Sequence, residues 1–222
     1  MHLVDLLPLL DDAETMEQVI DESRRTWSEI YDAMAPEDTL WVFAPNARKD
    51  NRYWPIAMAT ADTVREDSAL ALKNTITRYR DPKPGDDLSN TYEEILFFVK
   101  DKRQYRLDKD RIRVTHVYEG KDWGENRESG RSAYHDTEVQ RYNPNGKDPG
   151  NVWLEEVRDE TPNETVDETR PLSRVDALTR CLLAGSEPGE TVYTYWIGES
   201  FEQTITEQGR ELHEIERRGS LT

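Results

Sequence analysis

The sequence contains one cysteine, Cys181, among 222 residues. A single thiol excludes both an internal disulfide framework and a thiolate metal site. Cys181 lies on the apolar face of an expected helix, which predicts a buried structural thiol. No apolar run approaches the roughly 20 residues of a membrane-spanning helix. The first residues also lack the basic region and small-residue cleavage site of a secretory signal. We therefore expect a soluble, cytoplasmic protein.

Lysine is scarce, with 8 lysines against 21 arginines, whereas acidic residues are abundant. The 46 Asp and Glu residues outnumber the 29 Lys and Arg residues and give a formal net charge of −17. So acidic a surface stays hydrated in concentrated salt, which favours a halophilic host; the alternative is an ordinary acidic protein. Nucleic acid repels such a chain unless basic groups gather locally.

Helical and strand patterns alternate through the first hundred residues. Apolar residues at helical spacing predict one amphipathic helix from Glu14 to Met34, of about five or six turns. The other expected elements are a buried strand at 39–44, a polar turn at 46–51, a helix at 53–65, a half-exposed strand at 71–80, a loop at 81–89 and an apolar strand at 91–100. This alternation favours an α/β fold.

The segment from Arg170 to Arg217 organises the rest of the chain. It predicts a helix with Val175, Leu178, Leu182 and Leu183 on its apolar face, a Pro-Gly turn and a strand at 191–195. Gly198 is expected to permit a sharp exit into a second helix. A second strand then ends on Glu216, about 20 residues after the bend, where nucleoside-binding α/β units often place a ribose-binding carboxylate.

Residues 101–146 are rich in Arg, Tyr, Asn and Gly and show little periodicity. From Lys100 to Lys147 the chain has 12 Lys and Arg residues against 9 Asp and Glu residues, a local balance of +3. Basic groups are therefore gathered here, in contrast to the rest of the chain. His116 and His135 have no partner at metal-ligand spacing, so we expect surface or hydrogen-bonding histidines and no metal site.

Several segments resemble, in the same order, the amino-directed DNA methyltransferases of the N4-cytosine/N6-adenine type. The matching segments are Asn90–Lys100, Lys147–Trp153, Arg170-Pro171-Leu172, Pro188-Gly189-Glu190, Thr194–Phe201 and Glu214-Ile215-Glu216. The resemblance covers about Leu40 to Arg217. It implies a single domain over 1–222 with a Rossmann-like S-adenosylmethionine-dependent methyltransferase fold and a mixed, mostly parallel sheet. Within it, 101–146 would be a variable insert resembling a target-recognition region, and 170–217 the cofactor-site-like half.

The resemblance also implies a set of cofactor-site residues. These are Pro171, Thr194, Tyr195, Gly198, Ser200 and Glu216. The family's Asp-Pro-Phe is replaced by Thr194-Tyr195-Trp196, and only the first glycine of its Gly-Ser-Gly-Thr bend remains. The Cβ of Ser200 and the ring of Phe201 are expected where backbone should approach the cofactor. S-adenosylmethionine is thus implied by the family, but we expect its binding to have been lost.

In the insert, the resemblance implies contacts with duplex DNA. The expected phosphate-binding residues are Lys102, Arg103, Arg106, Arg111, Arg113, Arg127 and Arg131. Tyr118, Trp123 and Tyr134 are available to stack on a base. The alternative is a solvated insert whose basic residues pair with its own acidic residues and bind no ligand.

The family flips its target base and holds it with an Asp/Asn/Ser-Pro-Pro-aromatic motif. This chain has no pair of adjacent prolines, and Asp5 and Pro8 are the only remnants at the expected place. We therefore expect no catalytic residue. Three hypotheses follow. The first is a degenerate family member that binds DNA or a protein partner, and the partner would be a catalytic methyltransferase or a second copy of this chain. The second is an active enzyme with a divergent or shared site, and the third is a purely structural or interaction protein.

Overall fold

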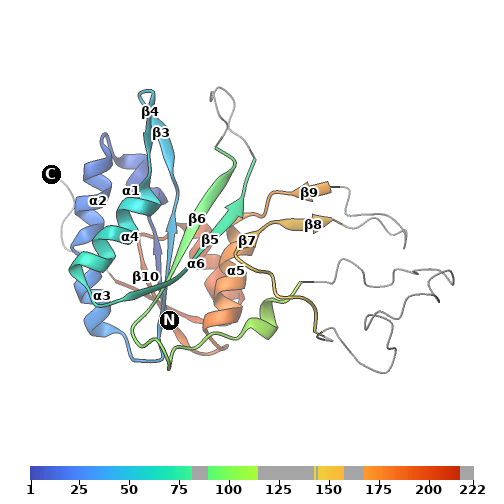
Figure 1. The fold of residues 1–222 in the computed structure, drawn as a ribbon. Coiled ribbons are helices and arrows are strands. Elements are labelled where there is room, and N and C mark those ends of the chain that lie inside the picture. Colours follow the sequence, from blue (N-terminus) through green and yellow to red (C-terminus); the bar gives the residue numbers. More distant parts are fainter. Residues whose placement is uncertain (82–89, 115–142, 144, 158–167, 216–222) are drawn as a thin grey trace, which may run out of the picture.

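A central sheet of seven strands runs through the protein, whose computed structural model describes residues 1–81, 90–114, 143, 145–157 and 168–215. The strand order is β11-β10-β1-β2-β6-β5-β7 (Figure 1). The strands are β1 His2–Asp5, β2 Thr39–Ala44, β5 Ala71–Tyr79, β6 Tyr92–Val99, β7 Val152–Trp153, β10 Thr191–Tyr195 and β11 Glu211–Glu214. This mixed α/β architecture confirms the predicted fold class.

The strands β11, β10, β1 and β2 are mutually parallel, and β6 is antiparallel to both β2 and β5. The carboxyl ends of β10, β1, β2 and β5 therefore lie along one edge of the sheet, together with the amino end of β6. We call this the carboxyl edge. In α/β sheets this edge is the usual place for a ligand site.

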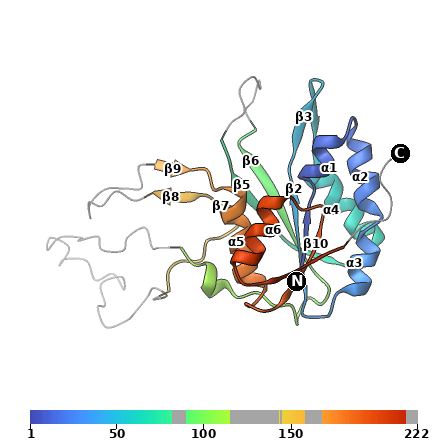
Figure 2. The ribbon, with the colours of Figure 1, turned by 180° about the vertical axis from the view of Figure 1, so that it is seen from behind.

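Helices cover both faces of the sheet (Figures 1 and 2). One face carries α1 Leu7–Asp12, α2 Met16–Arg24, α3 Trp27–Ala33 and α4 Ile56–Asp67. The other carries α5 Arg174–Gly185 and α6 Glu199–Glu207. Each layer has its own apolar core, since alternate residues of β2 point to opposite faces: Leu40 and Val42 to one, Trp41 and Phe43 to the other. None of the described helices is long and apolar enough to span a bilayer.

The predicted single helix at 14–34 is wrong, because two helices meet at Arg25 and Thr26. The first begins with a capping box between Thr15 and Gln18. It ends in a tight turn in which the amide of Thr26 donates to the Ser23 carbonyl. The second helix starts at Trp27, whose buried indole donates to Thr63 Oγ1 at 3.2 Å. Ser23 favours this end, because its hydroxyl donates to the Ile20 carbonyl at 3.0 Å inside an otherwise amphipathic pattern.

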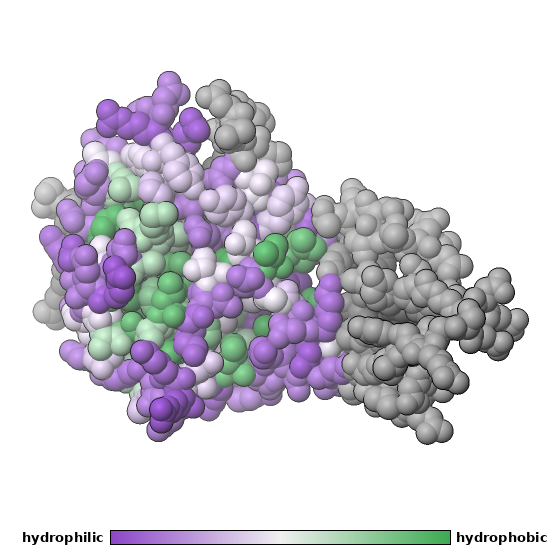
Figure 3. Space-filling model, in the orientation of Figure 1, coloured by the Kyte–Doolittle hydropathy of each residue, from purple (hydrophilic) through white to green (hydrophobic). Residues whose placement is uncertain are grey.

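The predicted polar turn at 46–51 is instead part of a hairpin of β3 Ala47–Lys49 and β4 Arg52–Trp54. Asp50 and Asn51 form its tip with φ of 50° and 58°. Two consecutive left-handed residues are typical of a type I′ turn, and Asp and Asn tolerate that conformation. The next helix begins at Ile56, after Pro55. Figure 3 shows apolar residues gathered over α4, where Met58 is 69% exposed.

Helix α5 packs closely against β2. Cys181 is fully buried, as predicted, and burial raises the pKa of its thiol well above the usual value. The buried face also includes Ala177, Leu178 and Leu182, whereas Val175, predicted on this face, is exposed. A Cβ at Gly185 would lie 3.0 Å from Trp41 Nε1 and 3.1 Å from Thr39 Oγ1, so any other residue would make these side chains shift by a few tenths of an ångström.

Shorter elements complete the described chain. The short helix η1 spans Lys109–Ile112, and the strands β8 Glu155–Val157 and β9 Glu168–Arg170 form a separate antiparallel pair. The predicted strands at 39–44, 71–80, 91–100 and 191–195 are confirmed within a residue or two of their ends as β2, β5, β6 and β10. The loop predicted at 81–89 lies, apart from Asp81, outside the described residues.

Candidate functional site

The predicted cofactor strands do lie side by side at the carboxyl edge. β1 pairs with β10 in parallel, and β10 pairs with β11 so that Thr194 is opposite Glu214. Asp5 ends β1 and Tyr195 ends β10. The strand β11 ends at Glu214, two residues before the predicted Glu216, which lies outside the described residues. The carboxyl ends of adjacent parallel strands thus bring Asp5 and the bend after Tyr195 to one edge.

The bend after β10 is built differently from the expected glycine turn. Trp196 has the positive φ of 54°, whereas Gly198 is extended at φ −93° and caps α6. Gly198 is expected, from the sequence, to permit the sharp bend between β10 and α6. This expectation is wrong, because any residue can adopt the extended backbone conformation of Gly198. A Cβ at Gly198 would meet nothing within 4 Å, so the space beside it is open.

Phe201 does not project into that open space. Its ring is buried in the core and packs edge-on against Phe43, with centroids 5.0 Å apart. The expectation that this ring obstructs the bend is wrong, because α6 turns it toward the sheet. Ser200 is exposed, and Pro171 is half-buried before α5. The buried Thr194 and Tyr195 contribute to the strand and the core.

Four charged side chains form a buried cluster at the carboxyl edge: Asp5, Arg78, Glu93 and Arg174, which we call the buried charge cluster. Arg174 Nη2 lies 2.7 Å from Asp5 Oδ1 and 3.0 Å from Glu93 Oε1. Arg78 Nη2 lies 2.6 Å from Glu93 Oε2. Two carboxylates and two guanidiniums balance in charge. Buried ions require such pairing, because their desolvation is costly.

Arg174 is central to this cluster. Its guanidinium also lies over the rings of Phe43 and Phe201, at 5.6 and 5.2 Å from their centroids. Cation–π contact of this kind holds the guanidinium between the strand ends and α6. Burial alone would lower the pKa of Arg174, but Glu93 and Asp5 outweigh it and raise that pKa.

Asp5, at the position where the resemblance placed a remnant of the catalytic motif, accepts two hydrogen bonds through one carboxylate oxygen. Its Oδ1 accepts from Arg174 and, at 2.9 Å, from the amide of Leu7. Burial raises the pKa of the Asp5 carboxyl, although Arg174 opposes this change. The next residue, Leu6, is fully buried, and its amide donates to the Phe43 carbonyl. The stretch after Asp5 therefore starts α1 with apolar residues.

Sequence reasoning missed Arg78, Glu93 and Arg174. One signal was present: Arg78 lies two residues after the buried Ile76, so strand alternation directs both side chains to the same face. A charged residue at a buried strand position requires a buried partner. The partner itself could not be identified, because Arg174 is 169 residues from Asp5 in sequence.

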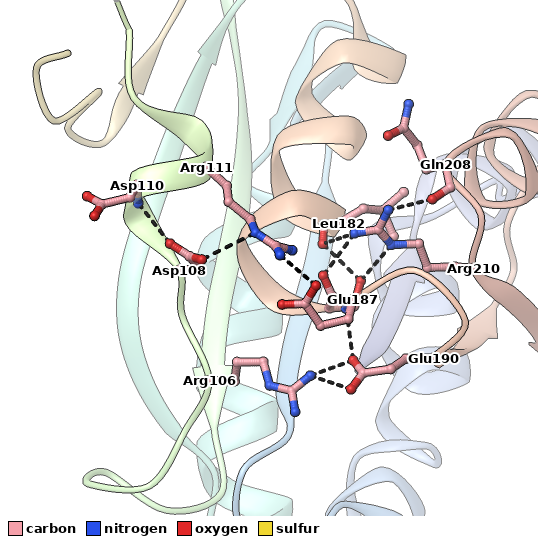
Figure 4. A network of polar contacts seen from close by, with 10 residues as sticks. Arg106, Asp108, Asp110, Arg111, Leu182, Glu187, Glu190, Gln208 and Arg210 are labelled. Atoms are coloured by element: carbon pink, nitrogen blue, oxygen red, sulfur yellow. Dashed lines mark hydrogen bonds and ion pairs between the residues drawn. The ribbon is translucent and has the colours of Figure 1, made fainter. Parts of the chain in front are cut away.

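Three of the predicted DNA-binding arginines are engaged in ion pairs, two of which, Arg106 and Arg111, are drawn in Figure 4. Arg106 pairs with Glu190, Arg111 with Glu187 and Asp108, and Arg113 with Asp110. These contacts attach the start of the insert to the turn between α5 and β10. Lys102 and Arg103 are exposed. Arg127, Arg131, Tyr118, Trp123, Tyr134, His116 and His135 lie outside the described residues.

The buried Arg210 stabilises the turn between α5 and β10 (Figure 4). Its guanidinium donates to the carbonyls of Leu182, Ser186 and Gln208, and to Ser186 Oγ. Burial lowers the pKa of Arg210. These bonds satisfy carbonyls at the carboxyl end of α5. The described residues include no group of three or more His, Cys, Asp or Glu residues placed to hold a metal ion.

Comparisons with known proteins identify the architecture. The PvuII cytosine-N4-specific DNA methyltransferase matches with a TM-score of 0.62 and 8% identity, covering 98% of this chain and 74% of that one. A candidate DNA modification methylase from Thermus thermophilus matches with a TM-score of 0.58 and 17% identity, covering 97% and 79%. Its structure in complex with S-adenosyl-L-methionine gives a TM-score of 0.55 at 19% identity, covering 96% and 79%. A search of curated proteins gives no match.

Because the sequence identities are low, these solved structures support the fold alone. The family is established by a sequence model described as DNA methylase, of the N6-adenine and N4-cytosine type, which matches residues 9–201. That range includes β2, β6, the insert, α5, β10 and the start of α6. Its extent confirms the resemblance noted from separate motifs: the chain belongs to the N6/N4 DNA methylase family.

Proposed function

We propose that this family member does not transfer methyl groups by itself and acts as a DNA-binding or partner-binding subunit. One observation carries the proposal: Asp5, at the place of the family's catalytic motif, is neutralised by Arg174 inside the buried charge cluster. An exocyclic amino group needs a hydrogen-bond acceptor and a stacking ring to be held for transfer. Asp5 already accepts two hydrogen bonds, and Leu6 and Leu7 follow it.

A second candidate function is supported by the open bend. The space beside Gly198 and the withdrawal of Phe201 into the core leave room next to β10. This favours retained binding of S-adenosylmethionine, for which Pro171, Thr194, Tyr195, Gly198, Ser200 and Glu216 remain the proposed residues. An enzyme with a shared site would then use this chain for the cofactor and another chain for the base.

Calorimetric titration with S-adenosylmethionine separates these two functions. We expect no binding at 1 mM ligand, about a thousandfold above a micromolar dissociation constant. The Thermus thermophilus protein crystallised with the same molecule provides the positive control. Binding in the micromolar range would contradict the degenerate proposal and favour the shared site. The Gly198→Trp variant, which fills the open space, should then abolish binding while circular dichroism stays unchanged.

A mobility-shift assay with duplex DNA tests the nucleic-acid role. Lys102 and Arg103 form no ion pair within the described residues, so Lys102→Ala with Arg103→Ala should weaken binding and lower the salt slope by about 0.9 per contact. Arg106→Ala should have a smaller effect, because Glu190 already neutralises that side chain. Arg25→Ala, at the C-cap of α2, and Arg65→Ala, on α4, are controls that remove exposed arginines paired with acidic residues three positions earlier. Failure of the unmodified protein to bind DNA would leave only the partner role.

Co-purification from the native host tests that partner role. The proposal predicts recovery of an active DNA methyltransferase or another DNA-processing protein together with this chain. Recovery of neither, combined with a negative mobility-shift result, would favour the third hypothesis of a structural protein.

A further inference from the structure

A cavity of about 370 Å³ opens at the carboxyl edge beside the buried charge cluster, between α1, the β3–β4 hairpin and the ends of β5 and β6. Figure 1 shows the hairpin and the β5–β6 pair extending from this same edge. The volume is within the range of small-molecule sites. The basic residues that line it are Arg48, Lys49, Arg78, Arg80 and Arg174.

The charge of this cavity is opposite to that of the protein. Five basic residues face two acidic ones, Asp11 and Glu93, and Asp5 pairs with Arg174 outside the lining, which leaves a local balance of +2 in a chain of net charge −17. A concave surface with one sign of charge focuses its potential and concentrates the opposite ion. The cavity therefore favours an anion.

Several of these cations already have partners. Arg78 and Arg174 belong to the buried charge cluster. Lys49 donates to the carbonyls of Leu10 and Ala13 at the end of α1. Arg80 differs in having no ion pair in the described part of the chain, and its Nε, like that of Arg174, is shielded from solvent and has no hydrogen-bond partner there.

Asn90, beside Arg80 in the cavity wall, also has an unsatisfied shielded atom, Oδ1, while its Nδ2 donates to the Asn46 carbonyl. A desolvated guanidinium nitrogen without an acceptor costs free energy, which a bound oxyanion would recover. A protonated phosphate oxygen could also donate to Asn90 Oδ1. An unsatisfied donor and an unsatisfied acceptor in one cationic cavity match the chemistry of a phosphate group.

We propose that this cavity binds one phosphate group of a nucleotide, with Arg80 as the principal donor and Arg48 at the exposed rim. Arginine suits this role because its planar guanidinium offers paired donors to phosphate oxygens. The phosphate belongs either to a free nucleotide or to a nucleic-acid strand. The inference does not depend on the proposed DNA-binding role of the insert, which lies on other elements.

Calorimetric titration at fixed ionic strength tests the cavity, with inorganic phosphate, deoxyadenosine 5′-monophosphate and a dithymidine phosphodiester as separate probes. Phosphate and the monophosphate should bind, and Arg80→Gln should weaken that binding about tenfold, as expected for a lost charged hydrogen bond. Arg65→Gln, the same change at an exposed helical site, should leave affinity within about twofold. If the diester also binds, the site is assigned to a phosphate of a nucleic-acid strand. If the diester does not bind, the site is assigned to the phosphate of a free nucleotide.

The absence of heat with all three probes would overturn the proposal, as would equal affinity of a folded Arg80→Gln variant. If Arg80→Gln does not fold, Arg48→Gln serves instead, because Arg48 is exposed. Loss of a rim charge should lower the affinity about threefold, and an unchanged affinity would again contradict the assignment. Phosphate binding without duplex binding would retain this inference while removing the DNA role of the insert.

Discussion

The Arg174→Met variant is expected to lose about 3 to 5 kcal/mol of unfolding free energy at pH 7. Arg174 holds two buried carboxylates, Asp5 and Glu93, and Asp5 has no other ion-pair partner among the described residues. Methionine preserves much of the apolar stem but leaves the Asp5 charge buried and uncompensated. Urea unfolding followed by circular dichroism measures the change.

Two controls make the Arg174 result specific. Arg65→Met removes an exposed arginine that pairs with Asp62 three residues away, and should cost less than about 1 kcal/mol. Asp5→Asn combined with Arg174→Met should recover part of the loss, because the uncompensated charge is gone. The defect should also shrink toward pH 4, since a raised carboxyl pKa allows Asp5 to become neutral. A loss below about 1 kcal/mol would show that the cluster contributes little.

Stability is expected to fall by about 3 kcal/mol between pH 7 and pH 4 through His2 alone. Burial lowers the pKa of His2 from 6.5 to about 4. The ring stacks on Tyr193 at 4.9 Å, and neither ring nitrogen has a hydrogen-bond partner in the described structure. The unfolded state therefore binds a proton at higher pH than the folded state. The contribution is fully present above pH 6.5 and is lost as the pH falls toward 4.

The His2→Phe variant isolates this effect, because phenylalanine keeps the stacking on Tyr193 but cannot titrate. Unfolding free energies of both proteins measured from pH 7 to pH 4 should diverge, with the unmodified protein losing more. Asp38, whose carboxylate lies 3.9 Å from His2 Nε2, offsets part of the loss as the ring becomes charged. Parallel curves for the two proteins would rule out a lowered pKa of His2.

Sequence reasoning identified β2, β5, β6 and β10 because these strands are strongly patterned, but it did not predict the short strands β1 and β7. The strands at 39–44 and 91–100 contain continuous apolar runs, and the strand at 71–80 shows period-two alternation. It failed where local chemistry competed with the pattern. Ser23 and Thr26 interrupt a continuous amphipathic stripe, and Asp50 with Asn51 adopt left-handed conformations that make a polar stretch into a hairpin. At the bend, Trp196 adopts the conformation that composition assigned to a glycine.

The candidate site was predictable only in its location. The resemblance placed the cofactor-site-like half at 170–217 and a remnant of the catalytic motif at Asp5, and the sheet register shows that Asp5 and the β10 bend lie at one edge. The partners of Asp5 were not predictable, because an ion pair between distant elements leaves no periodic trace in the sequence. Similarly, the arginines of the insert are indistinguishable by composition from DNA-binding residues. Arg106 and Arg111 instead pair with Glu190 and Glu187, from the other half of the chain.

The close contact at Gly185 has a consequence for the opposite end of helix α5. Arg174 and Gly185 are the first and last residues of the same rigid rod, which is about 17 Å long. The missing Cβ sets how deeply that rod sits on Trp41 and Thr39. A Cβ at 185 would press on Trp41, Thr39 and Met1, so these side chains or this end of the helix would have to shift by a few tenths of an ångström. The fit at Gly185 and the position of Arg174 beside Asp5 are therefore linked through one helix.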